Sequence, residues 1–202
     1  MKKGAKIGII VAVVVLVIIS AFVRYVVGTY NRLVSLEETV ESQWAQVQNQ
    51  YQRRYDLIPN LVATVKGYAS HESEIFTQVA EARSKAGGVM ELGSDVLDDP
   101  EKFEKFQQAQ NELSTGLGRL LAVAENYPEL KANENFLALQ DQLEGTENRI
   151  SVERKKFNEE VQKYNRAIRS FPGNLVANKH GFEKKAYFNA TEEAKTAPKV
   201  EF

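Results

Sequence analysis

The sequence predicts an all-α protein in which an N-terminal transmembrane helix is followed by an antiparallel bundle of about four long helices. Three observations predict this fold class. A run of 17 residues without a charged side chain, Ile7 to Val23, lies near the N-terminus. Beyond it, apolar residues recur at alternating spacings of three and four, as on one face of a helix. No clean period-two alternation and no Asn-Gly or Asp-Gly hairpin turn follows the run.

The composition narrows the possible functions. The chain has 202 residues, of which 43 % are apolar, enough for one domain with its own core. It has no cysteine, so disulfides, thiolate nucleophiles and Cys-ligated zinc sites are excluded. Residues 1–27 hold four basic residues and no acids, which leaves 22 basic and 27 acidic residues in 28–202. Such an acidic body lacks the basic surface that binds phosphates, and we expect no nucleic-acid partner.

The first element is an apolar helix over residues 7–27, which we interpret as an uncleaved membrane span. At 1.5 Å per residue it extends roughly 31 Å and matches a hydrocarbon core, provided that Arg24 reaches the headgroups. The alternative is a cleaved signal peptide, but the stretch is longer than an ordinary signal h-region. Three lysines in residues 1–6 precede the uncharged run of residues 7–23, and Arg24 and Arg32 follow that run. The positive-inside rule therefore places the N-terminus in the cytoplasm and the body outside.

Four apolar seams at helical spacing follow the span within residues 28–170. Each seam needs an apolar partner, so we expect the helices to share one core. The seams run through Tyr30, Leu33, Glu37, Val40, Trp44, Val47 and Tyr51; through Ile58, Leu61, Val65, Tyr68, Glu72, Ile75, Val79 and Ala82; through Phe103, Phe106, Gln110, Leu113, Leu117, Leu120 and Ala124; and through Phe136, Leu143, Ile150, Phe157, Val161, Tyr164 and Ile168.

Boundary signals divide this region into helices. Asp99-Pro100-Glu101 supplies an N-cap oxygen, a proline and a first-turn acid, and so predicts the start of the third helix. Asn126-Tyr127-Pro128-Glu129 predicts the start of the fourth in the same way, and Gly87-Gly88 predicts the end of the second. Gly116 and Gly118 each cost about 1 kcal/mol inside a helix relative to alanine. We expect close approach of a neighbouring helix there, with a local kink as the alternative.

The densest polar motif of the chain comprises Arg53, Arg54, Asp56, Pro59 and Asn60, which we interpret as a structural corner between two helices. If Asp56 is an N-cap, Pro59 falls in a first turn, where proline is tolerated; within a helix it costs roughly 3 kcal/mol. The arginines would lie beside the carbonyl-rich end of the preceding helix, a favourable position for cations. The alternative is a single kinked helix that runs from the membrane to Ala86.

The sequence predicts no catalytic, cofactor-binding or metal-ligating residue. The segment from His71 to Ile75 begins like the HExxH zinc motif but has isoleucine in place of the second histidine. The only other histidine, His180, lies in the tail. Phosphate-binding loop and nucleophile-elbow patterns are absent from the sequence. We therefore expect a protein that is not an enzyme and needs no cofactor, with a hydrolase or metalloenzyme as the least favoured alternative.

The last segment, residues 171–202, is a tail rich in aromatic side chains. Ser170-Phe171-Pro172-Gly173-Asn174 interrupts the helical periodicity before it. Disordered tails are poor in aromatics, so we expect this one to fold back and pack on the bundle, with docking on another subunit or a partner as the alternative. The predicted anchors are the rings of Phe171, Phe182, Tyr187, Phe188 and Phe202.

Several segments, spread over nearly the whole chain, together resemble the bacterial LemA family. They are Tyr30-Asn31-Arg32-Leu33-Val34, the block from Arg53 to Glu72, Tyr164-Asn165, Phe171-Pro172, Gly181-Phe182, Tyr187-Phe188-Asn189-Ala190 and Pro198-Lys199-Val200-Glu201-Phe202. The resemblance implies a single-pass protein of the bacterial inner membrane with a helical-bundle domain and no established enzymatic activity. A magnetosome-associated branch linked to organelle formation implies scaffolding.

These features lead to two hypotheses of function. In the first, residues 1–6 form a basic cytoplasmic N-terminus, residues 7–27 span the lipid bilayer, and residues 28–170 with the tail form a periplasmic or extracellular scaffold that assembles into a homo-oligomer. In the second, the bundle is an adaptor that presents a helical surface to another membrane protein, such as a protease or transporter.

Overall fold

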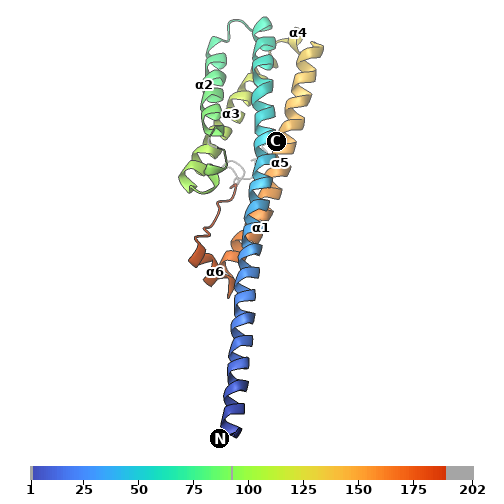
Figure 1. Ribbon diagram of the computed structural model, residues 1–202. Helices are drawn as coiled ribbons and strands as arrows, with labels where there is room; N and C mark the ends of the chain where they lie inside the picture. Colours follow the sequence, from blue (N-terminus) through green and yellow to red (C-terminus); the bar gives the residue numbers. More distant parts are fainter. Residues whose placement is uncertain (1, 92, 190–202) are drawn as a thin grey trace, which may run out of the picture.

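The computed structural model describes residues 2–91 and 93–189, and within these ranges every regular element is a helix (Figure 1). The all-α prediction is confirmed. The helices are α1 (Lys2–Tyr68), α2 (Ser73–Met90), the short 3₁₀ helix η1 (Gly93–Leu97), α3 (Pro100–Ala124), α4 (Pro128–Lys131), α5 (Glu134–Arg169) and α6 (Gly173–His180).

Helix α1 is continuous over 67 residues, which corresponds to about 100 Å. It passes through Pro59 without a break, so the predicted corner at residues 53–60 is wrong. The reason lies outside the local sequence. Proline cannot donate to the carbonyl of Tyr55, four residues earlier, but Arg83 of α2 donates its Nε–H to that oxygen at 3.4 Å. The guanidinium of Arg83 also lies 3.8 Å from the centre of the Tyr55 ring.

The chain reverses direction later, at residues 69–72 between α1 and α2. The alternative of one helix from the membrane to Ala86 is therefore also wrong. Helix α2 then continues past Gly87-Gly88 to Met90, so these glycines do not end it. Gly87 instead makes room for a neighbour, because a Cβ at this position would lie 3.0 Å from the hydroxyl of Tyr55.

The other boundary predictions have mixed outcomes. The start of α3 is confirmed, since Asp99 accepts hydrogen bonds from the amides of Glu101 and Lys102 at 2.9 and 3.2 Å. The segment from Asn126 to Glu129 leads only into the short α4. The long fourth helix begins later, where Asn133 caps the amide of Phe136 at 3.0 Å.

Only one of the two glycines inside α3 lies against a neighbouring helix. Gly116 is buried, and a Cβ there would lie 3.6 Å from a methyl group of Val79 on α2. Gly118 is exposed, and no atom of a neighbouring segment lies within 4 Å of a Cβ built there. The predicted close approach is thus confirmed for Gly116 and wrong for Gly118.

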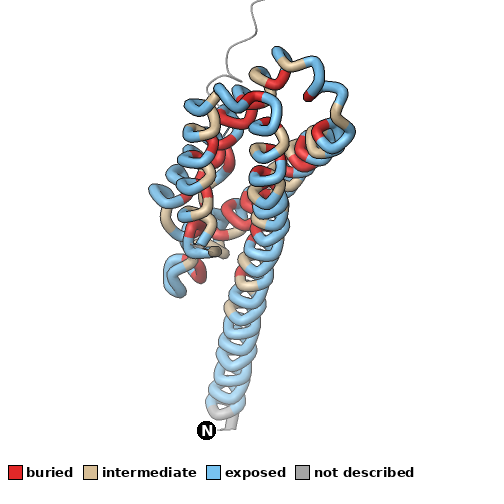
Figure 2. Tube along the Cα trace, turned by 90° about the horizontal axis from the view of Figure 1, so that it is seen from above, coloured by how far each residue is buried: buried red, intermediate tan, exposed pale blue. Residues whose placement is uncertain are grey.

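The four long helices form an antiparallel bundle in which α5 lies along the upper part of α1, and α2 pairs with α3 (Figure 1). Buried residues are confined to this upper part, as Figure 2 shows. The core divides into two clusters. The membrane-proximal cluster runs from Leu33 to Tyr51 on α1, and the distal cluster begins at Ile58 and extends to the turn after α1.

Below the bundle, the N-terminal part of α1 stands alone. Its most apolar 18-residue window has a mean hydropathy of 2.9, and none of that window is buried in the chain itself. It is the one candidate membrane span among the described residues. Val26 already packs against the membrane-proximal cluster, so the candidate span enters the bundle without an intervening linker.

Candidate functional site

The five residues of the predicted corner are not brought together into one site. Arg53, Asp56, Pro59 and Asn60 are exposed, whereas the side chain of Arg54 is buried with 1 % exposure. Asp56 accepts a hydrogen bond from Gln52 on its own helix at 2.8 Å. His71 is exposed in the turn at the far end of α1. The motif therefore forms no cleft that could hold a substrate or an ion.

Arg54 links three helices from within the core. Its guanidinium donates to Ser114 Oγ of α3 at 2.7 Å and to Glu147 Oε1 of α5 at 2.8 Å. It also donates to Gln110, both to the side-chain oxygen and to the backbone carbonyl, the latter at 3.3 Å. The Glu147 side chain is 41 % exposed, so one edge of this ion pair reaches solvent. Such a buried, multiply bonded arginine fixes the relative register of the helices that it joins.

These side chains form a polar layer that separates the two core clusters. We define the layer as Arg54, Gln110, Thr146 and Glu147, with Thr146 bonded to the carbonyl of Gln142 at 2.7 Å. On α1 the layer lies between Tyr51 of the membrane-proximal cluster and Ile58 of the distal cluster. The sequence indicated the charged motif but not that one arginine of the pair points inward.

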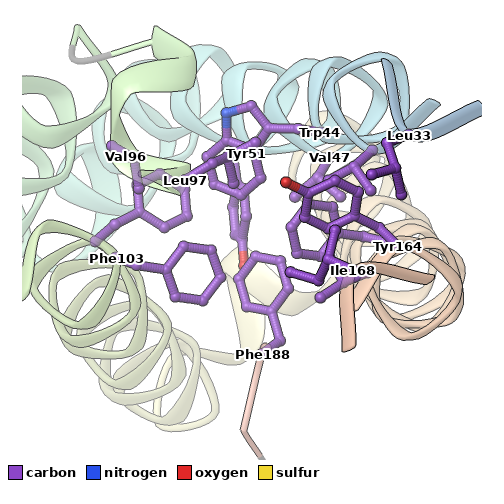
Figure 3. Close-up of a cluster of buried hydrophobic side chains, with 14 of the residues drawn as sticks. Leu33, Trp44, Val47, Tyr51, Val96, Leu97, Phe103, Tyr164, Ile168 and Phe188 are labelled. Carbon is purple, nitrogen blue, oxygen red and sulfur yellow. The ribbon is translucent and has the colours of Figure 1, made fainter. Parts of the chain in front are cut away.

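The C-terminal tail reaches the centre of the membrane-proximal cluster. Phe188, which is 6 % exposed, inserts among aromatic rings from three helices (Figure 3). Its ring centre lies 5.9 Å from Trp44, 5.0 Å from Phe103 and 5.4 Å from Phe157. Arg154 covers the ring at 4.6 Å. The predicted packing of the tail on its own bundle is confirmed.

Two asparagines of α5 hold the backbone of the tail. The side-chain amide of Asn165 donates to the carbonyl of Lys185 at 2.9 Å and accepts from its N–H at 3.1 Å. Asn158 makes the same pair of bonds with Phe188, both at 2.9 Å. The two asparagines are seven residues apart, about two helical turns, and therefore face the same side. We call this arrangement the asparagine clamp.

The side chain of Lys185 joins the tail to the bundle through ion pairs. It is 6 % exposed and pairs with Glu37 of α1 at 3.1 Å and with Asp98. Burial lowers the pKa of Lys185, but hydrogen bonds to Asp98 and Glu37 outweigh it and raise the pKa above its usual value. The hydroxyl of Tyr164 donates to Glu37 at 3.2 Å, and burial together with this carboxylate raises the pKa of the phenol.

The other predicted tail anchors occupy different environments. Phe182 is partly buried and lies 5.7 Å from the ring of Tyr30. Tyr187 is 38 % exposed, and Phe171 is 80 % exposed, so Phe171 does not anchor the tail on the bundle. Phe202 lies outside the described residues.

The residues that hold the tail were missed by sequence reasoning. Asn158 and Asn165 lie beside the seam formed by Phe157, Val161, Tyr164 and Ile168, and two amides one heptad apart were an available signal. Nothing local marks Lys185 as buried, because its partners are 87 and about 150 residues away. Among the described residues, no group of three His, Cys, Asp or Glu side chains is placed to hold a metal ion.

Comparison with known proteins shows a family and several relatives that the chain resembles in sequence. The family model described as "LemA family" matches residues 43–202. The chain is 27 % identical to the magnetosome protein MamQ of Magnetospirillum gryphiswaldense over 184 residues, which cover 84 % of this chain and 68 % of that protein. It is 24 % identical to the protein LemA of Metamycoplasma hominis over 174 residues, which cover 86 % of this chain and 75 % of that protein.

Proposed function

The chain belongs to the LemA family, and we propose that it is a non-enzymatic, membrane-anchored scaffold of the bacterial envelope that associates with copies of itself. The observation that carries this proposal is the continuity of α1, which runs from the candidate span to the distal end of the bundle. A bundle on a continuous helix is held at a fixed height and orientation above the bilayer, as a scaffold requires.

The interior of the bundle supports a structural role. Two of its buried polar side chains, Arg54 in the polar layer and Lys185 in the tail, bond to other parts of the same chain. Each serves to join segments far apart in sequence. The similarity to a magnetosome protein further supports a role at a membrane, because the magnetosome is a membrane-bounded organelle.

We place the protein in the inner membrane as a single-pass protein, with its N-terminus in the cytoplasm and its bundle in the periplasm or outside the cell. The basic residues of the first six positions support this topology. Since the chain has no cysteine, one introduced thiol gives an unambiguous test. A membrane-impermeant thiol reagent should label His71→Cys in cells with a permeabilised outer membrane, and should leave Lys6→Cys unlabelled until the inner membrane is opened.

Self-association is tested by counting subunits of the full-length protein in liposomes. A fluorophore on His71→Cys lies at the exposed end of α1, away from the bilayer. Many particles should photobleach in more than one step, and the fraction of such particles should not fall when the protein is diluted with lipid. Single steps throughout would contradict the scaffold. A monomer that copurifies with one stoichiometric membrane protein would favour the adaptor.

A further inference from the structure

The membrane-proximal end of the bundle carries a groove at the level where α1 leaves the candidate span. The junction of α5 and α6 packs against this part of α1. A Cβ built on Gly173 would lie 3.8 Å from the methyl carbon of Thr29. The ring centre of His180 lies 4.9 Å from that of Tyr30. The groove has a volume of about 350 Å³ and is lined by Arg32, Lys163, Arg166 and Phe171, among others. We call it the basal groove.

The charge of the chain is distributed unevenly around this groove. Its lining includes three basic residues, Arg32, Lys163 and Arg166, and no acid, whereas residues 28–202 as a whole hold 22 basic and 27 acidic residues. The rest of the body is therefore strongly acidic. A positive surface on an otherwise acidic body favours an anionic partner at this place.

Most basic side chains at the groove form no ion pair with another described residue of the chain. Lys163 pairs with Glu160 at 2.8 Å. Within residues 2–91 and 93–189, no carboxylate forms an ion pair with Arg32, Arg166 or Arg169. Arginine presents a planar fork of donors that matches a phosphate, so Arg32 and Arg166 are suited to hold one between α1 and α5.

Exposed apolar side chains flank the groove. Phe171 is 80 % exposed and Leu175 is 61 % exposed, both at the junction of α5 and α6. Leaving such side chains in water is unfavourable, whereas aromatic rings are stabilised at the boundary between hydrocarbon and headgroups. The combination of cations with exposed apolar groups is typical of a surface that lies on a membrane.

The distance of the groove from the candidate span places it at the surface of the membrane. The candidate span ends at residue 27, and Arg32 follows it by five residues, or roughly 8 Å along a helix. The polar region of each leaflet is about 5–8 Å thick, so Arg32 reaches the phosphate level of the leaflet under the bundle. Figure 1 shows α6 beside α1 just above the unaccompanied part of that helix.

We infer that the basal groove binds the headgroup of an anionic phospholipid, with Arg32 and Arg166 on the phosphate and with Phe171 and Leu175 inserted at the interface. The inference rests on the membrane anchoring proposed above, but not on self-association. A bound lipid would fix the rotation of the bundle relative to the membrane plane, since it ties α5 and α6 to the surface from which α1 emerges.

The test measures which lipids stay with the full-length protein. The protein is purified from micelles that contain equal amounts of phosphatidylglycerol and phosphatidylcholine, and retained lipids are quantified by mass spectrometry. We expect enrichment of phosphatidylglycerol, and a fall of roughly 5- to 30-fold in this preference for R32Q/R166Q, since each basic group near an anionic surface contributes about a factor of five. The charge-matched control is R53Q/R149Q, in which both arginines are exposed and lie higher on α1 and α5.

Three outcomes would overturn the inference. They are no preference in the unsubstituted protein, an equal loss in both double variants, and a preference that excess inorganic phosphate abolishes, which would indicate a free-phosphate site. A fluorophore on Ser170→Cys supplies an independent readout in phosphatidylglycerol liposomes. Headgroup-labelled quenching lipids should quench it but not a fluorophore on His71→Cys. Protein that fails to float with the liposomes would refute the anchoring itself, whereas a floating protein with an unquenched Ser170 label would refute only the groove.

Discussion

The two halves of the bundle are built from different parts of the chain. Above the polar layer, the distal half is a four-helix bundle of α1, α2, α3 and α5, with a mostly aliphatic core. Below it, α1, α5 and the first turns of α3 continue, α2 contributes only its last residues, Val89 and Met90, and η1, α6 and the tail complete the core. The proximal half therefore depends on an extended segment that the chain adds last, close to the membrane.

The contents of the two cores differ in the same way. The proximal cluster contains Trp44, Phe103, Phe157 and Phe188 in mutual contact, whereas among the described buried residues of the distal cluster the one aromatic ring is that of Phe136. Large rings fill the part of the core that lies beyond the end of α2. One seam pattern can therefore form two kinds of core within one bundle.

Removal of the ring that the tail contributes should destabilise the protein more than the other changes described below. Phe188→Ala should reduce the free energy of unfolding by about 3–5 kcal/mol, because it leaves a cavity in the aromatic cluster. Trp44, the single tryptophan of the chain, reports on this cluster by fluorescence, and far-UV circular dichroism reports on all helices. We expect the denaturation midpoint from fluorescence to fall well below that from circular dichroism. Tyr187→Ala, at a half-exposed neighbour, is the control and should change both little.

A somewhat smaller loss of stability is expected when Arg54 of the polar layer is replaced. Arg54→Ala leaves Gln110 and Glu147 without their partner and should destabilise the bundle by about 2–4 kcal/mol, at the lower end because Glu147 is partly exposed. Arg53→Ala, at the adjacent exposed position, should change stability by less than about 0.5 kcal/mol. Urea denaturation of the two variants checks this contrast. Equal effects would mean that the layer adds nothing to the connection between the halves.

A smaller effect is expected from the asparagine clamp. Asn165→Ala removes both hydrogen bonds to Lys185 and should cost about 1–3 kcal/mol, since a buried backbone N–H and carbonyl lose their partners. Hydrogen exchange of the Lys185 amide should accelerate more than that of amides in α2. Asn133→Ala, which removes the helix cap at the distal end, is the matched change in the other half. Acceleration confined to α2 in the Asn165 variant would contradict the assignment of the clamp.

The smallest effect is a dependence on alkaline pH. The pKa values of Lys185 and Tyr164 are both raised in the folded protein, so the folded state holds these protons more tightly than the unfolded chain. Their contribution is complete below the unfolded values of about 10, and it is lost as the pH rises through the raised values. Denaturation followed by Trp44 fluorescence should show this loss in the unsubstituted protein. A Lys185→Met/Tyr164→Phe variant should show less of it, and an unchanged profile would argue against the ion pairs.

Much of the fold could be predicted from the sequence because most of its seams are regular. Val40, Trp44 and Val47 are all buried, as their spacing predicts. The corner was predicted wrongly because a proline in a helix leaves the carbonyl four residues earlier without its donor. Here that carbonyl belongs to Tyr55, and Arg83 of a different helix donates to it. No local pattern contains that contact.

In the tail, too, the local sequence does not show which residues make contacts with distant segments. Its aromatic content predicted that it packs on the bundle, but which ring is buried depends on a space whose walls come from α1, α3 and α5. Phe188 fills that space, and Phe171, with equal hydrophobicity, is left at the surface. Composition indicates that a segment docks, whereas the three-dimensional cavity decides which residue enters.

Whether α1 carries the bundle as one continuous helix can be measured as a distance along it. Spin labels on Glu38→Cys and Lys66→Cys, both at exposed positions, flank the polar layer and Pro59. Electron–electron double resonance on the labelled full-length protein, diluted with unlabelled protein in liposomes, should give one narrow distribution near 42 Å, the length of 28 helical residues. A chain that turned at residues 53–60 would bring the labels back toward each other, and a distance below about 30 Å would contradict a continuous α1.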